Sequence, residues 1–246
     1  MAKNRNNCII LLVEPPEQEK ISGELKTAFG PERAAHVNGD LLLEAYRTLK
    51  NFNDAILILS YEKTQQHPDL TWLDPEDPGF LDYKNKPLEE RIRNAFQLAF
   101  FTGAKKVLLV NHLSPELKEE WLSQAFGAVS DKTVALGPTQ EGTFYLLGLT
   151  QQNQKILEAP GFLSGKTLEN MTERIKKGKL SVLTMPETYC VTSEDSLRKW
   201  IENREKTPNF FPEKQEHMPE QKRHNRHHVK AHENTAPPGN NDVAGE

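Results

Sequence analysis

The stretch AFFTGAKKVLLVNHLSPEL, residues 99–117, decides the fold. Gly103 follows a helix with an apolar face, and glycine is common just after a helix because it adopts a left-handed backbone without strain. The run Val107–Val110 is continuously apolar, as expected for a buried strand. The strand ends at Asn111, where ligands bind in open parallel sheets, and Pro115 predicts the start of another helix. The stretch therefore predicts a helix–strand–helix unit with a ligand site at the strand tip.

The rest of the chain repeats this alternation of strands and helices. The predicted strands are Cys8–Val13, Ala55–Leu59, Lys105–Val110, Thr133–Leu136, Phe144–Leu149 and Ser181–Met185. The predicted helices are Glu17–Phe29, Glu32–Lys50, Leu88–Thr102, Pro115–Phe126, Thr167–Lys177 and Ser193–Asn203. Such alternation predicts an α/β domain whose mostly parallel sheet carries helices on both faces.

Two segments do not follow the alternation. Glu62–Pro87 contains four prolines and several aspartates, so we expect a mobile functional loop over the strand tips. The segment 208–246 has five prolines and five of the eight histidines, with few aliphatic residues. It cannot bury enough apolar surface to offset its ordering entropy. We therefore predict one domain over residues 1–207 and a disordered, His-rich tail over residues 208–246.

Composition excludes several classes of protein. Of 246 residues, 36% are hydrophobic and 27% are charged, which is typical of a soluble globular domain with a polar appendage. The net charge of -4 argues against a general nucleic-acid binder. The apolar runs are much shorter than the ~20 residues of a membrane span. The two cysteines, Cys8 and Cys190, are expected to be buried free thiols, which predicts a cytoplasmic protein.

Several motifs carry a resemblance to a known family. They are LEERI at residues 88–92, AFFTGAKKVLLV at 99–110, SPEL at 114–117 and LGPTQEGTFYLLGL at 136–149. In this order they resemble the bacterial transferases of the nucleotide-diphosphosugar transferase superfamily, also labelled selenodomain-associated transferases or a glycosyltransferase-like domain of unknown function. The resemblance covers roughly residues 8–201. It implies a single GT-A-like domain, a nucleotide-sugar substrate and a bound Mg²⁺ or Mn²⁺.

The chain departs from the family pattern at the charged positions of the implied site. The family's strand-tip aspartate falls on Leu113, its Asp-Gly-Gly on 141–143 and its late Asp-Val-Asp on 190–192. In the basic N-terminal loop, Glu14, Glu19, Ser22 and Glu24 replace lysine, glycine, lysine and arginine. Mg²⁺ and Mn²⁺ prefer carboxylate oxygens, and phosphates prefer cations. At about 5 Å and an effective dielectric of about 20, one like-charge contact costs about 3 kcal/mol.

Two residues are candidates for catalysis. Glu141 is the carboxylate that remains at a family position, and it could ligate a metal or act as a base; the alternative is a strand-end glutamate that faces water. His112 lies at the strand tip, where a titratable imidazole could transfer protons; the alternative is a loop histidine without function. The candidate ligand contacts are Asn111, Ser114, Glu90, Arg91, Gly142 and Tyr145.

Each ligand contact also has a structural interpretation. Asn111 and Ser114 could cap the following helix. Gly142 could serve the backbone of a turn. Glu90 and Arg91 could form a plain ion pair within or beside their helix.

The functional hypothesis is a degenerate, non-catalytic glycosyltransferase-like protein, a pseudoenzyme. It would bind a small ligand or a protein partner in the cleft, with no cofactor. The alternative is an active glycosyl- or nucleotidyltransferase whose altered site uses Glu141, with Mg²⁺ or Mn²⁺. The tail cluster His224–His232 predicts at most weak binding of Zn²⁺ or Ni²⁺, and its basic residues could tether an acidic partner.

Overall fold

The computed structural model describes residues 3–13, 17, 21, 23–61, 63–70, 73, 80–82 and 86–206. The predicted tail lies outside these residues, so its disorder stays a prediction. Within the described residues, no helix is long and apolar enough to cross a membrane.

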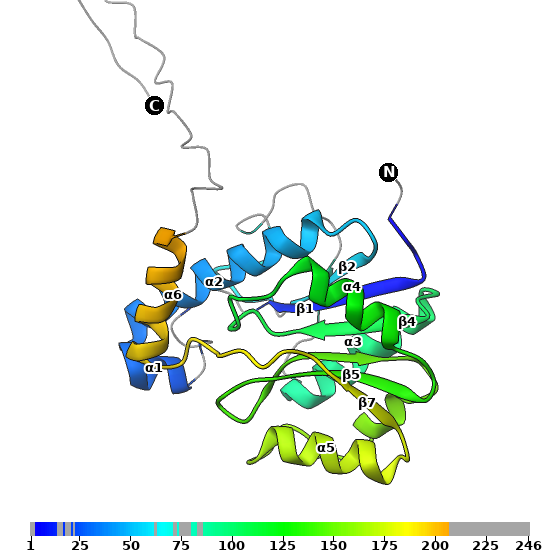
Figure 1. Cartoon of the computed structure of the whole chain (residues 1–246). Coiled ribbons are helices and arrows are strands. Elements are labelled where there is room, and N and C mark those ends of the chain that lie inside the picture. The colour runs from blue at the N-terminus through cyan, green and yellow to red at the C-terminus, as the bar shows by residue number, and fades with distance from the viewer. Residues whose placement is uncertain are drawn as a thin grey trace, which may run out of the picture. The chain divides into compact units, whose positions relative to one another are not determined.

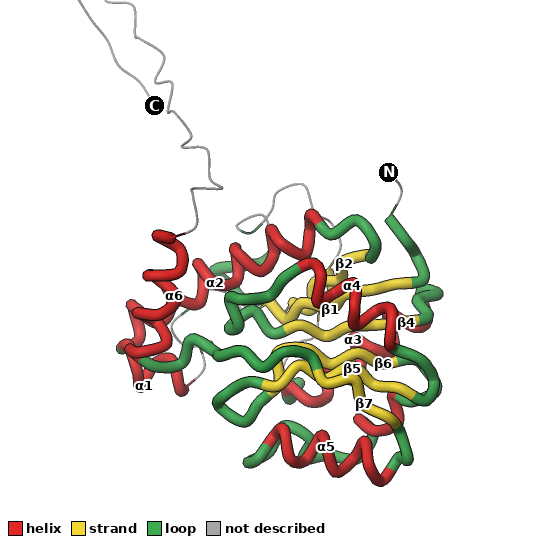
Figure 2. Tube along the Cα trace, viewed as in Figure 1, coloured by secondary structure: helices red, strands yellow, loops and turns green. Residues whose placement is uncertain are grey.

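One sheet of seven strands forms the centre of the domain (Figure 2). Its order is β3-β2-β1-β4-β6-β5-β7. The strands are β1 (Asn7–Val13), β2 (Ile56–Tyr61), β3 (Phe80–Asp82), β4 (Lys106–Val110), β5 (Thr133–Pro138), β6 (Phe144–Leu149) and β7 (Ser181–Thr184). β6 runs antiparallel to β4 and β5, whereas the other paired strands are parallel. The predicted α/β class with a mostly parallel sheet is confirmed.

Helices cover both faces of this sheet. They are α1 (Gly23–Phe29), α2 (Pro31–Asn51), α3 (Leu88–Phe101), α4 (Glu119–Ala128), α5 (Thr167–Lys177) and α6 (Glu194–Lys206), with a 3-10 turn η1 (Gln154–Leu157). Alternate strand residues face opposite sides of the sheet. Ile9 and Leu11 of β1 therefore pack with α2 and α4, while Cys8 and Ile10 pack with α3 and α5.

A third apolar cluster joins α1, α2 and α6 beyond the carboxyl ends of the central strands (Figure 1). We call it the edge cluster. Ser193 caps α6, because its Oγ accepts a hydrogen bond from the Ser196 amide at 3.2 Å. The buried members of the edge cluster are Ile21, Leu25, Phe29, Ala34, Val37, Leu41, Tyr189, Val191, Leu197 and Trp200.

Three elements differ from the prediction. The helix after β4 begins at Glu119 instead of Pro115. The first helix begins at Gly23, and Glu17 lies outside it. The predicted loop 62–87 contributes the short strand β3 and two core residues, Leu70 and Leu73. The mobility of the loop is untested, but Leu70 and Leu73 are buried in the core.

Candidate functional site

The loop after β4 is tied to the chain that follows β7. The Asn111 side-chain oxygen accepts a hydrogen bond from the Leu113 amide at 3.0 Å, which closes a tight turn. The Leu113 carbonyl accepts one from the Val191 amide at 2.9 Å. The Ser114 hydroxyl lies 3.3 Å from the Cys190 sulfur. These contacts, rather than helix capping, are the roles of Asn111 and Ser114, because the helix begins only at Glu119.

The turn between β5 and β6 reaches the same place. Gly142 has φ +76°, a left-handed backbone, so the predicted turn role of this glycine is confirmed. Glu141 is exposed, and its Oε2 accepts a hydrogen bond from the Cys190 amide at 2.9 Å. The Thr143 hydroxyl lies 4.0 Å from the Cys190 sulfur. Positions 113, 141–143 and 190–192, which the resemblance identifies as one site, therefore meet in space.

The chemistry at this meeting point differs from that of a cation site. Leu113 is partly buried and packs against the edge cluster. The Cys190 thiol is buried, and this burial raises its pKa, so the sulfur stays protonated. Around Cys190 the chain thus offers hydroxyls, a neutral thiol and the Glu141 carboxylate. This donor set does not suit Mg²⁺ or Mn²⁺, and the described residues contain no group of three or more His, Cys, Asp or Glu that could hold a metal ion.

His112, which the sequence offers as a possible proton-transfer group or as a loop histidine without function, is buried in the structure. It is 5% exposed, and its Nε2 lies 2.7 Å from Oδ1 of Asn38 on α2. Burial lowers the pKa of His112 to about 4. The imidazole is therefore neutral at physiological pH and links the loop to α2, instead of facing a ligand.

Tyr145 also occupies the core rather than the edge of the sheet. It is 1% exposed, and its ring lies 5.8 Å from that of Trp121. Its hydroxyl donates to the Pro186 carbonyl at 3.1 Å, and burial raises its pKa. The expected ligand contact is thus corrected to a packing residue.

The other half of the carboxyl edge lies at β2 and the start of α3. Glu90 is partly exposed and forms an ion pair with Lys86, which lies just before α3, with Oε1 and Nζ 2.6 Å apart. Lys86 lowers the pKa of Glu90 through this contact. Arg91 is buried, and its Nη2 donates to the Ser60 carbonyl at 3.4 Å. Glu90 and Arg91, which the sequence suggests as a possible ion pair, therefore contact different partners.

A carboxylate–histidine pair near this half was missed by sequence reasoning. His67 Nδ1 lies 2.7 Å from Glu17 Oε1, and both side chains are mostly buried. The Thr64 hydroxyl also donates to Glu17. The pair joins the loop after β1 to the loop after β2. No local sequence pattern predicts this pair, because its members lie 50 residues apart.

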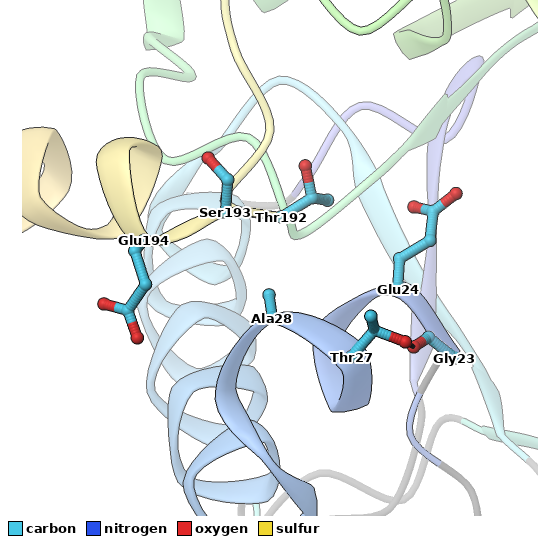
Figure 3. A pocket seen from close by; sticks show the side chains of 7 residues that line it. All are labelled: Gly23, Glu24, Thr27, Ala28, Thr192, Ser193 and Glu194. Carbon is cyan, nitrogen blue, oxygen red and sulfur yellow. Dashed lines mark hydrogen bonds between the residues drawn. The ribbon is translucent and has the colours of Figure 1, made fainter.

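A shallow groove of about 880 Å³ opens between α1 and the start of α6. Figure 3 shows its residues: Glu24 and Glu194 lie on opposite sides, with Ala28 between them and Thr192 and Ser193 above. The resemblance aligns Thr192 with an aspartate and Glu24 with an arginine. The groove is therefore lined by both the N-terminal segment around Glu24 and the segment around Thr192, and each differs in charge from the pattern that the resemblance implies.

Comparisons with known proteins agree with this fold. Residues 45–160 match a family described as "Uncharacterized protein conserved in bacteria (DUF2064)". A protein from Desulfovibrio desulfuricans G20 described as a nucleotide-diphospho-sugar transferase is 22% identical; the alignment covers 85% of this chain and 90% of that one, with a TM-score of 0.73. The 4-diphosphocytidyl-2C-methyl-D-erythritol synthase from Anaerococcus prevotii is 9% identical over 81% of this chain and 96% of that one, with a TM-score of 0.55. A search of curated proteins gave no match.

At these identities the structural likeness establishes the fold. The sheet is that of nucleotide-diphosphosugar transferases and nucleotidyltransferases, as the resemblance predicts.

Proposed function

We propose that this chain, whose residues 45–160 carry the DUF2064 match on a GT-A-like sheet, binds a small ligand or a protein partner without transferring a sugar. The observation that carries this proposal is the environment of Leu113. At the strand tip, where the resemblance implies a metal-binding aspartate, an apolar side chain packs against the edge cluster. The position serves the stability of the domain.

The surroundings of Leu113 support the same proposal. Val191 is fully buried, and its amide is bonded to the Leu113 carbonyl, so the two aligned segments are joined by backbone and packing. In the groove, Glu24 lies where the resemblance implies an arginine. A glutamate repels a diphosphate that an arginine would attract. Both changes oppose the binding of a metal–diphosphate complex.

Calorimetric titration with UDP- and GDP-sugars tests the proposal. We expect no Mn²⁺-dependent, saturable binding at ligand concentrations up to about 1 mM, which corresponds to about -4 kcal/mol. Leu113→Asp alone should not restore binding, since the glutamates still repel phosphate. Adding Glu14→Lys and Glu24→Arg should help. Micromolar, Mn²⁺-dependent binding by the unmodified chain would overturn the proposal.

The second candidate is an active glycosyl- or nucleotidyltransferase that uses Glu141. The exposure of this carboxylate at the edge of the sheet favours it. Release of nucleoside diphosphate or pyrophosphate from a nucleotide substrate, abolished by Glu141→Gln and retained by Glu187→Gln on the next exposed loop, would establish this candidate.

A further inference from the structure

We infer that Arg91 and Ser60 form a binding subsite for a small oxyanion, a phosphate or a carboxylate group, at the carboxyl end of β2. This inference deepens the proposed function, on which it rests for the role of the cleft, by naming the chemistry of the ligand. Two buried polar atoms carry it. Arg91 Nε and Ser60 Oγ are enclosed, and the described residues offer neither of them a hydrogen-bond partner.

The first step concerns charge. A guanidinium is always protonated in proteins, and an isolated buried charge is costly unless it is paired. Arg91 is only 6% exposed. Among the described residues, its guanidinium makes one long hydrogen bond to a backbone carbonyl, at 3.4 Å. This neutral acceptor does not balance the charge, whereas an anion bound beside the guanidinium would.

The second step concerns the carboxylates beside Arg91 on α3. Both Glu89 oxygens accept backbone hydrogen bonds, from the amides of Gly161 and Leu163, each at 2.8 Å. Glu90 is paired with Lys86 on the more exposed side of the helix. The two acidic neighbours of Arg91 are therefore committed to other partners.

The third step concerns shape and place. The planar guanidinium presents donors that match the oxygens of phosphate or carboxylate, and the Ser60 hydroxyl can donate another hydrogen bond. Ser60 is next to the last residue of β2 and pairs with Leu12 near the end of β1. The two side chains thus lie at the edge where open α/β sheets bind ligands.

The test is thermal unfolding of the full chain in the presence of inorganic phosphate, with chloride at equal ionic strength as the reference. We expect phosphate to raise the melting temperature in a saturable manner. Arg91→Met should weaken the apparent affinity at least tenfold, and Ser60→Ala should weaken it less. Arg93→Met, on the same helix, is the matched control, since Arg93 bonds the Leu157 carbonyl and should leave the response intact.

A parallel series with acetate separates the two ligand classes. A response to phosphate alone assigns a phosphate site, and a response to both assigns a general oxyanion site. If Arg91→Met does not fold, Arg91→Lys keeps the charge but loses the planar donors and should bind more weakly. No response by the unmodified chain, or an equal response by the Arg91 variants, would overturn the inference. The probes contain no nucleotide, sugar or metal, so the result is independent of the nucleotide-sugar titration.

Discussion

The carboxyl edge of the sheet is built differently in its two halves. In the half around β4 and β6, the positions of implied ionic residues are occupied by Leu113, Cys190 and Thr192, which are packed or hydrogen-bonded within the protein. In the half around β2 and α3, Arg91 keeps a buried charge without a carboxylate partner among the described residues.

The difference between the halves concerns which of them is suited to bind a ligand. The apolar packing of Leu113 and the hydrogen bond from the Cys190 amide to Glu141 stabilise the fold, but they leave few oxygen ligands for a cation. A buried guanidinium costs stability unless a ligand compensates it. We therefore interpret the first half as structural and the second as the place where a ligand binds.

The largest expected effect is the loss of stability at acidic pH caused by His112, which lies in the half that we interpret as structural. Its folded-state pKa is about 4, against 6.5 for an unperturbed histidine. The unfolded chain therefore takes up a proton that the folded chain does not as the pH falls. The contribution of neutral His112 to the free energy of unfolding is fully present above pH 6.5. As the pH falls to about 4, about 3 kcal/mol of this contribution is lost progressively.

Denaturant unfolding between pH 7.5 and about 4 measures this loss. His112→Gln removes the titrating group, so the difference between the two proteins isolates its contribution from other acid effects. Equal pH dependence in both would mean that His112 is accessible to protons in the folded state and that this half of the edge is open.

The next largest effect is the loss of stability expected when a carboxylate is introduced at the strand tip. It tests whether the half around β4 and β6 is structural. Leu113→Asp places a charge against the edge cluster and should cost about 1–3 kcal/mol of unfolding free energy at neutral pH. The cost should decrease at acidic pH, where the carboxyl is protonated. Ile201→Asp, at an exposed position on α6, is the control and should change stability by less than about 0.5 kcal/mol. An unchanged stability for Leu113→Asp would contradict a structural role.

The smallest expected effect concerns the tail. Removal of residues 208–246 should change the free energy of unfolding by less than about 0.5 kcal/mol, because the tail lacks apolar residues at any regular spacing. Urea unfolding of the chain ending at Thr207 measures it. Loss of cooperative unfolding in the shortened chain would show that residues 208–246 stabilise the domain together with the two halves.

The sequence predicts most of the sheet because its strands and helices have strong apolar patterns. It also predicts the turn at Gly142 and the two buried thiols. It does not predict β3, since three residues are too few for a periodic signal. The helix after β4 begins at Glu119, beyond a turn that the Asn111 side chain closes, and Pro115 does not reveal this later start.

The site is predicted in place but not in detail. The resemblance assigns positions 113, 141 and 190 to one site, and the structure places these positions together. The burial of His112 depends on Asn38, 74 residues away, and the environment of Arg91 depends on Ser60, 31 residues away. Contacts of this range follow from the packing of helices on the sheet, which local sequence patterns do not specify.

The central proposal is that the half around β4 and β6 does not bind a metal–diphosphate complex. Electron paramagnetic resonance of free Mn²⁺, in a titration of the protein with Mn²⁺ and GDP, tests it most directly, with Mn²⁺ and GDP alone as the reference. The chain ending at Thr207 excludes binding by the tail histidines. We predict the same free Mn²⁺ signal with and without this protein. A protein-dependent loss of the signal at micromolar concentrations, reversed by Glu141→Gln, would contradict the account.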